Sequence, residues 1–360
     1  MKQKRKIVCI QNSQDPLKGK KDSMVTRKAI MVDTHSLLEA NIIEPKYRGR
    51  LLEGITYNPS NDTLLWVDII LAEVHRVFLS SPERTHQVLR FENEGESIGA
   101  IGLTSNDNIL IVCGKFGIAK ASFATGEIDY FLKYQHDEKQ HSRLRSNDAM
   151  IDPWGNLWVG VMTDFPVIAK EGKPSPEGRL YHVNCHDLTM SIMEDYSFIP
   201  NGLAFSNDGK RFFWTDSLTD TIWEYDYDFI ANKLLNKRKF IDFKKIPSVQ
   251  DKGCVPDGLV MTIDNEIYSA VFNSGKVLHF DTSGECIEAY KLPAKKPTCA
   301  TIGGKNFDLL FVTTAHLHEE DMNVFIDPYD KSGDLGGFLY CYKLPRPAKA
   351  RSKNIWGGKI

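Results

Sequence analysis

Acidic and amide side chains recur at four places in the sequence, each directly before a small residue and an apolar run. They occur as EGITY at Glu53, NDAMI at Asn147 and Asp148, NGLAF at Asn201 and DGLVM at Asp257. Carboxylate and carboxamide oxygens are hard ligands, which suit Ca²⁺, Mg²⁺ or Mn²⁺ better than a metal that prefers sulfur. The sequence therefore offers the donors of a divalent-cation site, provided that the fold brings them together.

Turn chemistry is the alternative explanation for each of these residues taken alone. Asn-Gly and Asp-Gly pairs are common in turns, where neither residue needs a metal. The elements that carry the residues decide between the two interpretations, because only a fold that places all four at one point can use them as a set.

A pair of short apolar runs is repeated six times along the chain. The first runs are LLWVDI, ILIVCG, LWVGVM, RFFWTD, IYSAVF and LLFVTT, which start near residues 64, 109, 157, 212, 267 and 309. They are rich in Val, Ile, Phe, Tyr and Trp and are separated by turn residues, as antiparallel strands are. A period of about 40–50 residues with several strands per unit is typical of a β-propeller. The sequence therefore predicts an all-β fold, a six-bladed β-propeller with four antiparallel strands per blade.

The sixth unit lacks an evident fourth strand after Leu344. We expect a strand from within residues 28–45, either AIMVD or NII, to supply it and close the ring. The predicted organisation is a basic, flexible N-terminal tail at residues 1–27, the propeller at 28–345 and a C-terminal tail at 346–360. Residues 313–335, which contain His316 and His318, are expected to form a solvated rim loop, with a lid over the channel mouth as the alternative.

Equivalent positions in a propeller lie at one height around the central channel. Counting back ten or eleven residues from the second strand of each unit gives a set of equivalent positions. This set includes Glu53, Asn147 with Asp148, Asn201 and Asp257. Converging carboxylates repel one another and are costly to bury unless a cation or a proton lies between them. The repeat therefore favours an axial metal site at one mouth of the channel over four unrelated turns.

Composition excludes several other classes of protein. Among 360 residues, 42% are hydrophobic and 26% are charged, as in ordinary globular domains. The net charge of −2 argues against a nucleic-acid partner, and the lack of a long apolar run argues against a membrane-spanning helix. We expect a monomer or a weak homodimer.

The expected compartment follows from the cysteines and from the N-terminal residues. Seven cysteines, odd in number and without a CxxC pair, are expected to be free thiols in a reducing cytoplasm. Residues 1–28 hold nine Lys and Arg but no apolar stretch long enough for a secretory signal, so a nuclear address is an alternative to a cytoplasmic one.

Five stretches together resemble the regucalcin/gluconolactonase family, also called the senescence marker protein family. They are LLEGITYNPSNDTLLWVDI, GESIGAIGL, RSNDAMIDPWGNLWVGVM, IPNGLAFSNDGKRFFWTDS and VPDGLVMTIDNEIYSAVFNSGKVLHFD. The resemblance covers about residues 40–345. It implies a six-bladed propeller with one divalent metal in the axial channel. It also implies a gluconolactonase-like hydrolase that opens sugar or aliphatic lactones, although some members act on organophosphate esters.

Carried over by position, the resemblance implies metal ligands at Glu53, Asn201 and Asp257. Ca²⁺ is the first choice of metal, with Mg²⁺, Mn²⁺ or Zn²⁺ as alternatives. Asn147 would lie near the metal and bind substrate, and Arg145 would hold the hydroxyl groups of a sugar lactone. A small-molecule lactone is thus the expected partner.

Hydrolysis of a lactone needs a positioned water, a base and stabilisation of the developing oxyanion, to which a divalent ion contributes. Asp257 is the expected ligand and general base, and Asp148 is the alternative base or a proton relay. The acid that the family often places near the substrate has only Asp164 as its counterpart here. A calcium-binding propeller without catalysis and a protein-interaction scaffold are the alternative functions.

Overall fold

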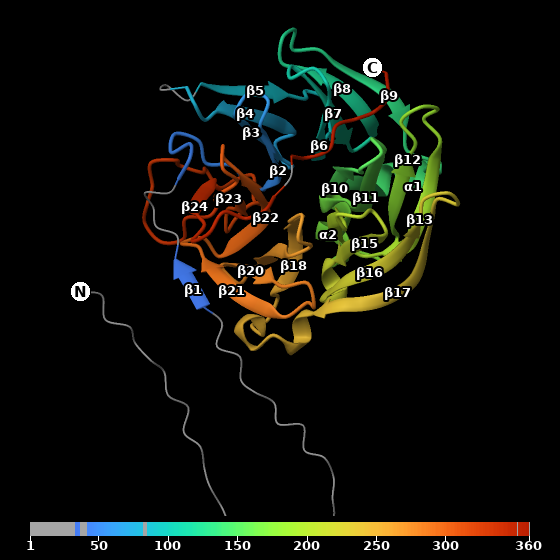
Figure 1. Cartoon of the computed structure of the whole chain (residues 1–360). Coiled ribbons are helices and arrows are strands. Elements are labelled where there is room, and N and C mark those ends of the chain that lie inside the picture. The colour runs from blue at the N-terminus through green and yellow to red at the C-terminus, as the bar shows by residue number, and fades with distance from the viewer. Residues whose placement is uncertain (1–32, 37–41, 82–84, 351, 360) are drawn as a thin grey trace, which may run out of the picture. The chain divides into compact units, whose positions relative to one another are not determined.

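The alternation of apolar runs and turns folds into six small antiparallel sheets arranged around a central channel (Figure 1). The computed structural model describes residues 33–36, 42–81, 85–350 and 352–359. Each sheet is one blade of a propeller, as the repeat predicts. The expected N-terminal tail at residues 1–27 lies outside the described residues.

The first three blades each contain four strands in sequence order. The first blade holds β2 (Leu52–Asn58), β3 (Thr63–Asp68), β4 (Glu73–Phe78) and β5 (His86–Arg90). The second holds β6 (Ile98–Leu103), β7 (Ile109–Gly114), β8 (Gly117–Ser122) and β9 (Ile128–Lys133). The third holds β10 (Leu144–Ile151), β11 (Leu157–Thr163), β12 (Gly178–Val183) and β13 (Met190–Ser197).

The other three blades differ in their outer strands. The fourth holds β14 (Pro200–Phe205), β15 (Arg211–Asp216), β16 (Thr221–Asp228) and β17 (Lys233–Asp242). The fifth holds β18 (Val255–Met261), β19 (Ile267–Phe272), β20 (Lys276–Phe280) and β21 (Cys286–Lys291). The sixth has three strands, which are β22 (Lys296–Gly303), β23 (Leu309–Ala315) and β24 (Tyr340–Lys343).

The edge of the sixth blade is completed from the N-terminal side, but only by a short contact. Ile42 forms an antiparallel bridge with Tyr340, and the N–H of Ile43 donates to the carbonyl of Leu339 at 2.9 Å. The strand β1 (Asp33–Ser36) instead pairs in parallel with β21, as a fifth strand of the fifth blade. Thus Ile42 and Ile43 of the NII stretch reach the sixth blade, whereas Asn41 and residues 29–32 of the AIMVD stretch lie outside the described residues.

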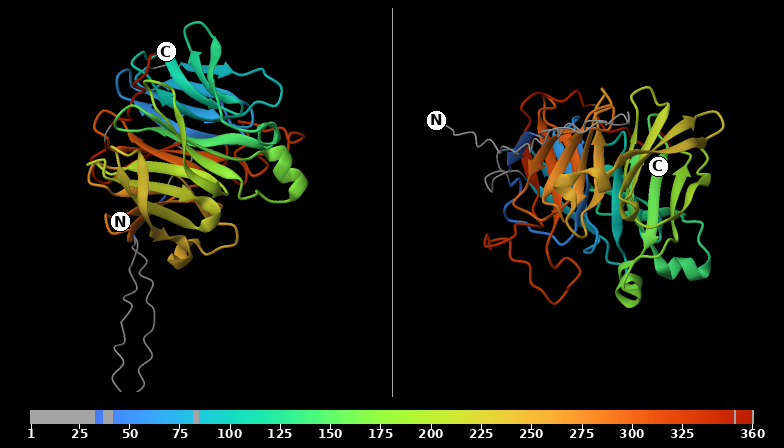
Figure 2. Two further views of the ribbon diagram at one scale, coloured as in Figure 1. Left: turned by 90° about the vertical axis from the view of Figure 1, so that its right-hand side faces the viewer. Right: turned by 90° about the horizontal axis from the view of Figure 1, so that it is seen from below.

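Helical turns are short and lie between strands. They are α1 (Glu138–Arg143), α2 (Phe165–Glu171), η2 (Ser217–Thr219), η3 (Phe243–Lys245) and η4 (Pro247–Val249). Figure 2 shows α1, α2 and the long loop after β23 projecting from the same face of the ring. None of the helices within the described residues is long and apolar enough to cross a membrane.

The first strand of each blade lines the channel, and each contacts the first strands of the two neighbouring blades. Every one of these six inner strands loses its regular register near its beginning. The irregular points lie between the pairs Glu53/Thr56, Ile98/Ala100, Ser146/Ala149, Asn201/Leu203, Pro256/Leu259 and Pro297/Ala300. A bulge at this place turns side chains away from the regular alternation, so the beginnings of the inner strands can face the axis.

Large aromatic side chains pack between the blades. Trp66, Trp158 and Trp214 occupy the second strands of their blades and are almost completely buried. Trp158 and Trp214 share one apolar cluster, which joins the third blade to the fourth. The repeated tryptophans are therefore packing residues of the blades.

The C-terminal segment crosses the end of the channel where the inner strands finish. Its backbone N–H groups at Trp356 and Gly357 donate to the carbonyls of Leu103 and Gly155 at 2.8 and 3.0 Å. Trp356 itself is 3% exposed. We call residues 352–357 the strap, because they tie the chain end across the second and third blades.

Candidate metal and substrate site

Glycines allow neighbouring inner strands to approach closely at the level of the bulges. A Cβ atom on Gly202 would lie 2.8 Å from the carbonyl oxygen of Asp257, and one on Gly258 would lie 2.5 Å from Sγ of Cys299. Both distances are too short for a methyl group. The glycines of the Asn-Gly and Asp-Gly pairs are thus needed for close contact between neighbouring strands, which a free turn would not require.

Asn147 and Asn201, which lie on neighbouring blades, are directly joined. The Nδ2 group of Asn147 donates to Oδ1 of Asn201 at 2.8 Å and to the carbonyl of Pro200 at 2.9 Å. The Nδ2 group of Asn201 donates in turn to Oγ of Ser217 at 2.9 Å. These bonds fix the orientation of both carboxamides.

Glu53 and Asp257 are buried carboxylates from the first and fifth blades. Oε2 of Glu53 accepts from the N–H of Gly54 at 3.0 Å, its one hydrogen bond among the described residues. Burial raises the pKa of both groups well above their usual range, and the negative charges of Asp257 and Asp148 raise the pKa of Glu53 further. The positive charge of Arg145 opposes these changes only in part.

Arg145 is the buried cation of this region. Its Nη1 group donates to Oδ1 of Asn147 at 2.9 Å and to the carbonyl of Ser146 at 2.7 Å, and its guanidinium lies 4.2 Å from the ring centre of Phe165. Burial lowers the pKa of Arg145 to about 10, and the charge of Asp164 opposes that change. The buried Nε group has no hydrogen-bond partner among the described residues.

Asp164 is already engaged by other residues. Its Oδ2 atom lies 2.5 Å from Nζ of Lys115, and its Oδ1 atom accepts from the N–H of Phe165 at 2.8 Å as the N-cap of α2. Oδ1 also lies 4.0 Å from Nε of Arg145. Because these contacts occupy both carboxylate oxygens, Asp164 is better placed to orient Arg145 than to bind a substrate.

Asp148 is less enclosed than its neighbour Asn147. Its Oδ1 atom accepts from the N–H of Ala149 at 2.8 Å. Burial raises the pKa of Asp148 to about 6, against the positive charge of Lys353 and the hydrogen bond from Ala149. Asp148 can therefore exchange a proton close to neutral pH.

The donor set fits a divalent cation. Glu53 and Asp257 are buried, repel one another and have no nearby cation except Arg145, which is the situation that a bound cation relieves. Within the described residues, no group of three or more His, Cys, Asp or Glu side chains is placed to hold a metal. The set found here consists of two carboxylates and a carboxamide, which are the oxygen ligands that Ca²⁺ accepts.

Some residues of this region are not indicated by the repeat. Lys115 lies in the turn between two strands of the second blade, and Lys353 comes from the strap. Ser217 follows β15 and accepts from Asn201. Only Ser217 could have been found from the pattern, because it follows the repeated second strand directly.

The loop between β23 and β24, which contains His316 and His318, is held at many points. Arg48 donates to the carbonyls of Gly336, Asp330 and Asp334 at 2.7–3.0 Å. Arg50 donates to the carbonyls of Asp321 and Val324 at 3.0 and 2.9 Å. The loop is thus a fixed part of the rim.

Comparisons with known proteins show the family of the chain. The family model described as SMP-30/Gluconolactonase/LRE-like region matches residues 51–316. The cell growth-regulated gene 1 protein of Candida albicans is 50% identical over 342 residues, which are 90% of this chain and 99% of that protein. The pentonolactonase XacC of Haloferax volcanii is 26% identical over 271 residues, 74% of this chain and 82% of that protein.

Among solved structures, the calcium-binding protein regucalcin from Agrobacterium tumefaciens matches with a TM-score of 0.74 and 23% identity, over 91% of this chain and 99% of that chain. This likeness shows the six-bladed propeller fold. Because the family model matches well over half of the residues, the chain belongs to the SMP-30/gluconolactonase/LRE-like family.

Proposed function

We propose that this protein is a divalent-metal-dependent lactonase, which adds water to the ester bond of a sugar or aliphatic lactone and releases the hydroxy acid. The observation that carries the proposal is the meeting of two buried carboxylates and two hydrogen-bonded carboxamides beside a buried arginine. Membership of a family that includes a named pentonolactonase supports the same substrate class.

Glu53, Asn201 and Asp257 are the residues that would hold the cation, and oxygen-only donors favour Ca²⁺. When bound, the cation would polarise the lactone carbonyl and offset the negative charge that develops on its oxygen. The calcium-binding regucalcin of the same fold agrees with this choice. Mg²⁺, Mn²⁺ and Zn²⁺ are alternatives that metal analysis would separate.

Arg145 and Asn147 would orient the substrate. The guanidinium of Arg145 would donate to a hydroxyl or carbonyl oxygen, while the bond from its Nη1 group to Asn147 holds it in place. Arg145→Ala should therefore raise the KM for sugar lactones more than the KM for aliphatic lactones, since only sugars offer several hydroxyl groups to the arginine.

Asp257 or Asp148 would take the proton from the attacking water. A base works best when its pKa lies near the working pH, and the pKa of Asp148 is raised to about 6. If Asp148 acts in this way, Asp148→Asn should lower turnover by about 10²–10⁴-fold with the metal still bound. If it only supports the ligands, the main effect should be a loss of metal affinity by about 10–100-fold.

The deciding experiment is metal analysis of the purified protein, followed by a panel of lactones and phosphotriesters with and without EDTA. Turnover of lactones that EDTA abolishes and Ca²⁺ restores is the expected result. Full metal occupancy without turnover would favour a metal-binding propeller without catalysis instead. A cytoplasmic location belongs to the same proposal, and the free thiols of Cys113, Cys185, Cys254, Cys286 and Cys299 support it.

A further inference from the structure

The acid beside Arg145 is shared unequally between two cations. Oδ2 of Asp164 lies 2.5 Å from Nζ of Lys115, whereas its Oδ1 atom lies 4.0 Å from Nε of Arg145. All three side chains are at most 10% exposed. A buried arginine and a carboxylate attract each other strongly and usually meet through hydrogen bonds of about 2.7–2.9 Å. The pair of Asp164 and Arg145 is therefore held open.

Asp164 is fixed from two sides. Its backbone N–H donates to the carbonyl of Arg143 at 2.7 Å, and its Oδ1 atom accepts from the N–H of Phe165 at 2.8 Å at the start of α2. These bonds set the backbone and one oxygen. Lys115 is the one partner of Oδ2 among the described residues, so its ammonium group sets the direction of the carboxylate.

Lys115 reaches this acid from a firmly held turn. It lies between β7 and β8 of the second blade, whereas Asp164 follows β11 of the third. The backbone N–H of Lys115 donates to Oε1 of Glu96 at 2.7 Å and to the carbonyl of Ser97 at 2.9 Å. Oε2 of Glu96 accepts in turn from the hydroxyl of Tyr130 at 2.6 Å. The second blade thus delivers one charge to the substrate site of the third.

Arg145 depends on weaker, neutral acceptors for its orientation. Its Nη1 group donates to Oδ1 of Asn147 at 2.9 Å, and Asn147 donates to Asn201 at 2.8 Å. Hydrogen bonds between two charged groups are about twice as strong as those to neutral acceptors. A carboxylate of Asp164 that was free to turn would therefore draw the guanidinium away from Asn147.

We propose that Lys115 is a positioning residue, which holds Asp164 away from Arg145 and so keeps the guanidinium directed at the hydroxyl groups of a substrate. This inference rests on the substrate site of the proposed function. It makes the preference for lactones with several hydroxyl groups depend on a lysine that acts only through Asp164.

The first test is the steady-state kinetics of the full-length protein on a sugar lactone and an aliphatic lactone. Lys115→Met removes the charge and keeps most of the volume. It should raise the KM for the sugar lactone about tenfold, the worth of one hydrogen bond to a charged group, and leave kcat within about twofold. The KM for the aliphatic lactone should change less than about twofold. Lys115→Arg keeps the charge and should stay within about threefold of the wild type on both substrates.

A second substitution separates positioning from stability. Asp164→Asn keeps the size of the side chain and an N-cap for α2, but the amide cannot form an ion pair with Arg145. Added to Lys115→Met, it should return the KM for the sugar lactone to within about threefold of the wild-type value. If Lys115 only stabilised the fold, the second substitution would leave the damage unchanged or increase it.

A crystal structure of Lys115→Met gives a readout that needs no turnover. The distance between Oδ1 of Asp164 and Nε of Arg145 should shorten from 4.0 Å to about 2.8 Å, and the bond from Arg145 to Asn147 should be lost. Lys115→Gln is also uncharged and serves for the same measurements if Lys115→Met does not fold.

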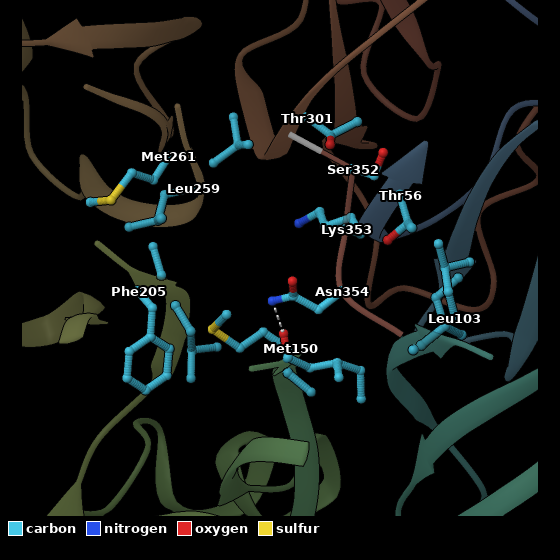
Figure 3. Close-up of a pocket in the computed structure, with 17 residues that line it drawn as sticks. Thr56, Leu103, Met150, Phe205, Leu259, Met261, Thr301, Ser352, Lys353 and Asn354 are labelled. Atoms are coloured by element: carbon cyan, nitrogen blue, oxygen red, sulfur yellow. Dashed lines mark hydrogen bonds between the residues drawn. The ribbon is translucent and has the colours of Figure 1, made fainter. Parts of the chain in front are cut away.

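Lys353→Met is the matched control, since Lys353 is also a partly buried lysine of the channel. Figure 3 shows its side chain directed into the space between Leu259, Met150 and Thr56. Neither Asp164 nor Arg145 is among the described residues that line this cavity. The control should leave the ratio of the KM values for the two lactones unchanged.

Three results would overturn the inference. They are an equal rise in KM for both lactones in Lys115→Met, a double variant that recovers nothing, and a distance between Asp164 and Arg145 that stays near its present value without Lys115. If the wild-type protein opens no lactone, the proposed function fails, while the crystal structure of Lys115→Met still decides whether Lys115 holds the two residues apart.

Discussion

At one end of the axial channel the six inner strands begin with bulges, and at the other they finish in regular pairing. The bulged end carries Glu53, Asn147, Asn201 and Asp257, all of them buried and polar. The regular end is lined mainly by apolar side chains and is covered by the strap. The same strands thus provide a chemical end and a structural end.

The difference shows how a repeat can carry function without losing stability. Regular pairing at the finishing ends keeps the blades together, because every strand residue there keeps its cross-strand partner. Bulges near the beginnings release a few side chains from that pairing and aim them at the axis. Substitutions at the two ends should therefore have effects of different kinds, which the following predictions separate.

Removing a carboxylate at the bulged end should have the largest effect. Glu53→Ala and Asp257→Ala should each abolish stoichiometric metal binding and lower lactone turnover by about 10³-fold or more, since the charge stabilisation that a metal supplies is worth several kcal/mol. Metal analysis and steady-state kinetics measure the two effects. Asp129→Asn, at an exposed position of β9, is the control and should change neither. Survival of metal content and turnover in both Ala variants would show that the site is wrongly assigned.

Removing the aromatic anchor of the strap should lower stability and spare the metal. Trp356 is buried against the cluster that contains Ile111 and Tyr134. Trp356→Ala should lower the free energy of unfolding by about 3–5 kcal/mol, as measured by urea denaturation. Ile355→Ala is the control, because this neighbour is 47% exposed and should cost less than about 1 kcal/mol. If Trp356→Ala lost its metal as well, the two ends would not be separate in function.

The sequence predicts the repeating part of the molecule better than the rest. The six strand pairs and the meeting of Asn147 with Asn201 follow from equivalent positions in the repeat, because a propeller places such positions at one height. The bulges were not predicted, since a register shift changes pairing but not the pattern of apolar residues. Lys353 and the path of the strap were not predicted either, because the chain end is not part of the repeat and its contacts depend on the completed ring.

The metal-free protein should lose stability as the pH rises. Burial, together with the charges of nearby acids, raises the pKa of Glu53 and Asp257, so both carboxyl groups hold protons more tightly in the folded state than in the unfolded state. Their contribution is fully present below about pH 4, near the pKa of unfolded carboxyl groups, and is lost as the pH rises through the raised values. Each group contributes a slope of at most about 1.4 kcal/mol per pH unit.

The measurement is chemical denaturation in EDTA between pH 4 and pH 8, set by the ordinary range of carboxyl titration. The double variant Glu53→Gln, Asp257→Asn is the reference, since it keeps the size of both side chains but cannot titrate. The difference in unfolding free energy between wild type and reference should become less favourable to the wild type as pH rises. A difference that is constant with pH would contradict the raised pKa values.

The smallest effect is expected at the rim of the bulged end, where Glu320 lies in the loop that Arg50 holds. Glu319 is paired with Lys296 at 2.6 Å, whereas Glu320 has no ion pair among the described residues and its charge acts on Arg145. Glu320→Gln should therefore improve kcat/KM for a lactone that carries a carboxylate by about two- to threefold relative to a neutral lactone. The effect is small because Glu320 is exposed, and salt should remove it, since exposed charges are screened.

Asp321→Asn, at the exposed neighbour of Glu320, is the control. An equal change in both variants would mean that the charge of the whole loop, and not the position of Glu320 near Arg145, acts on the substrate.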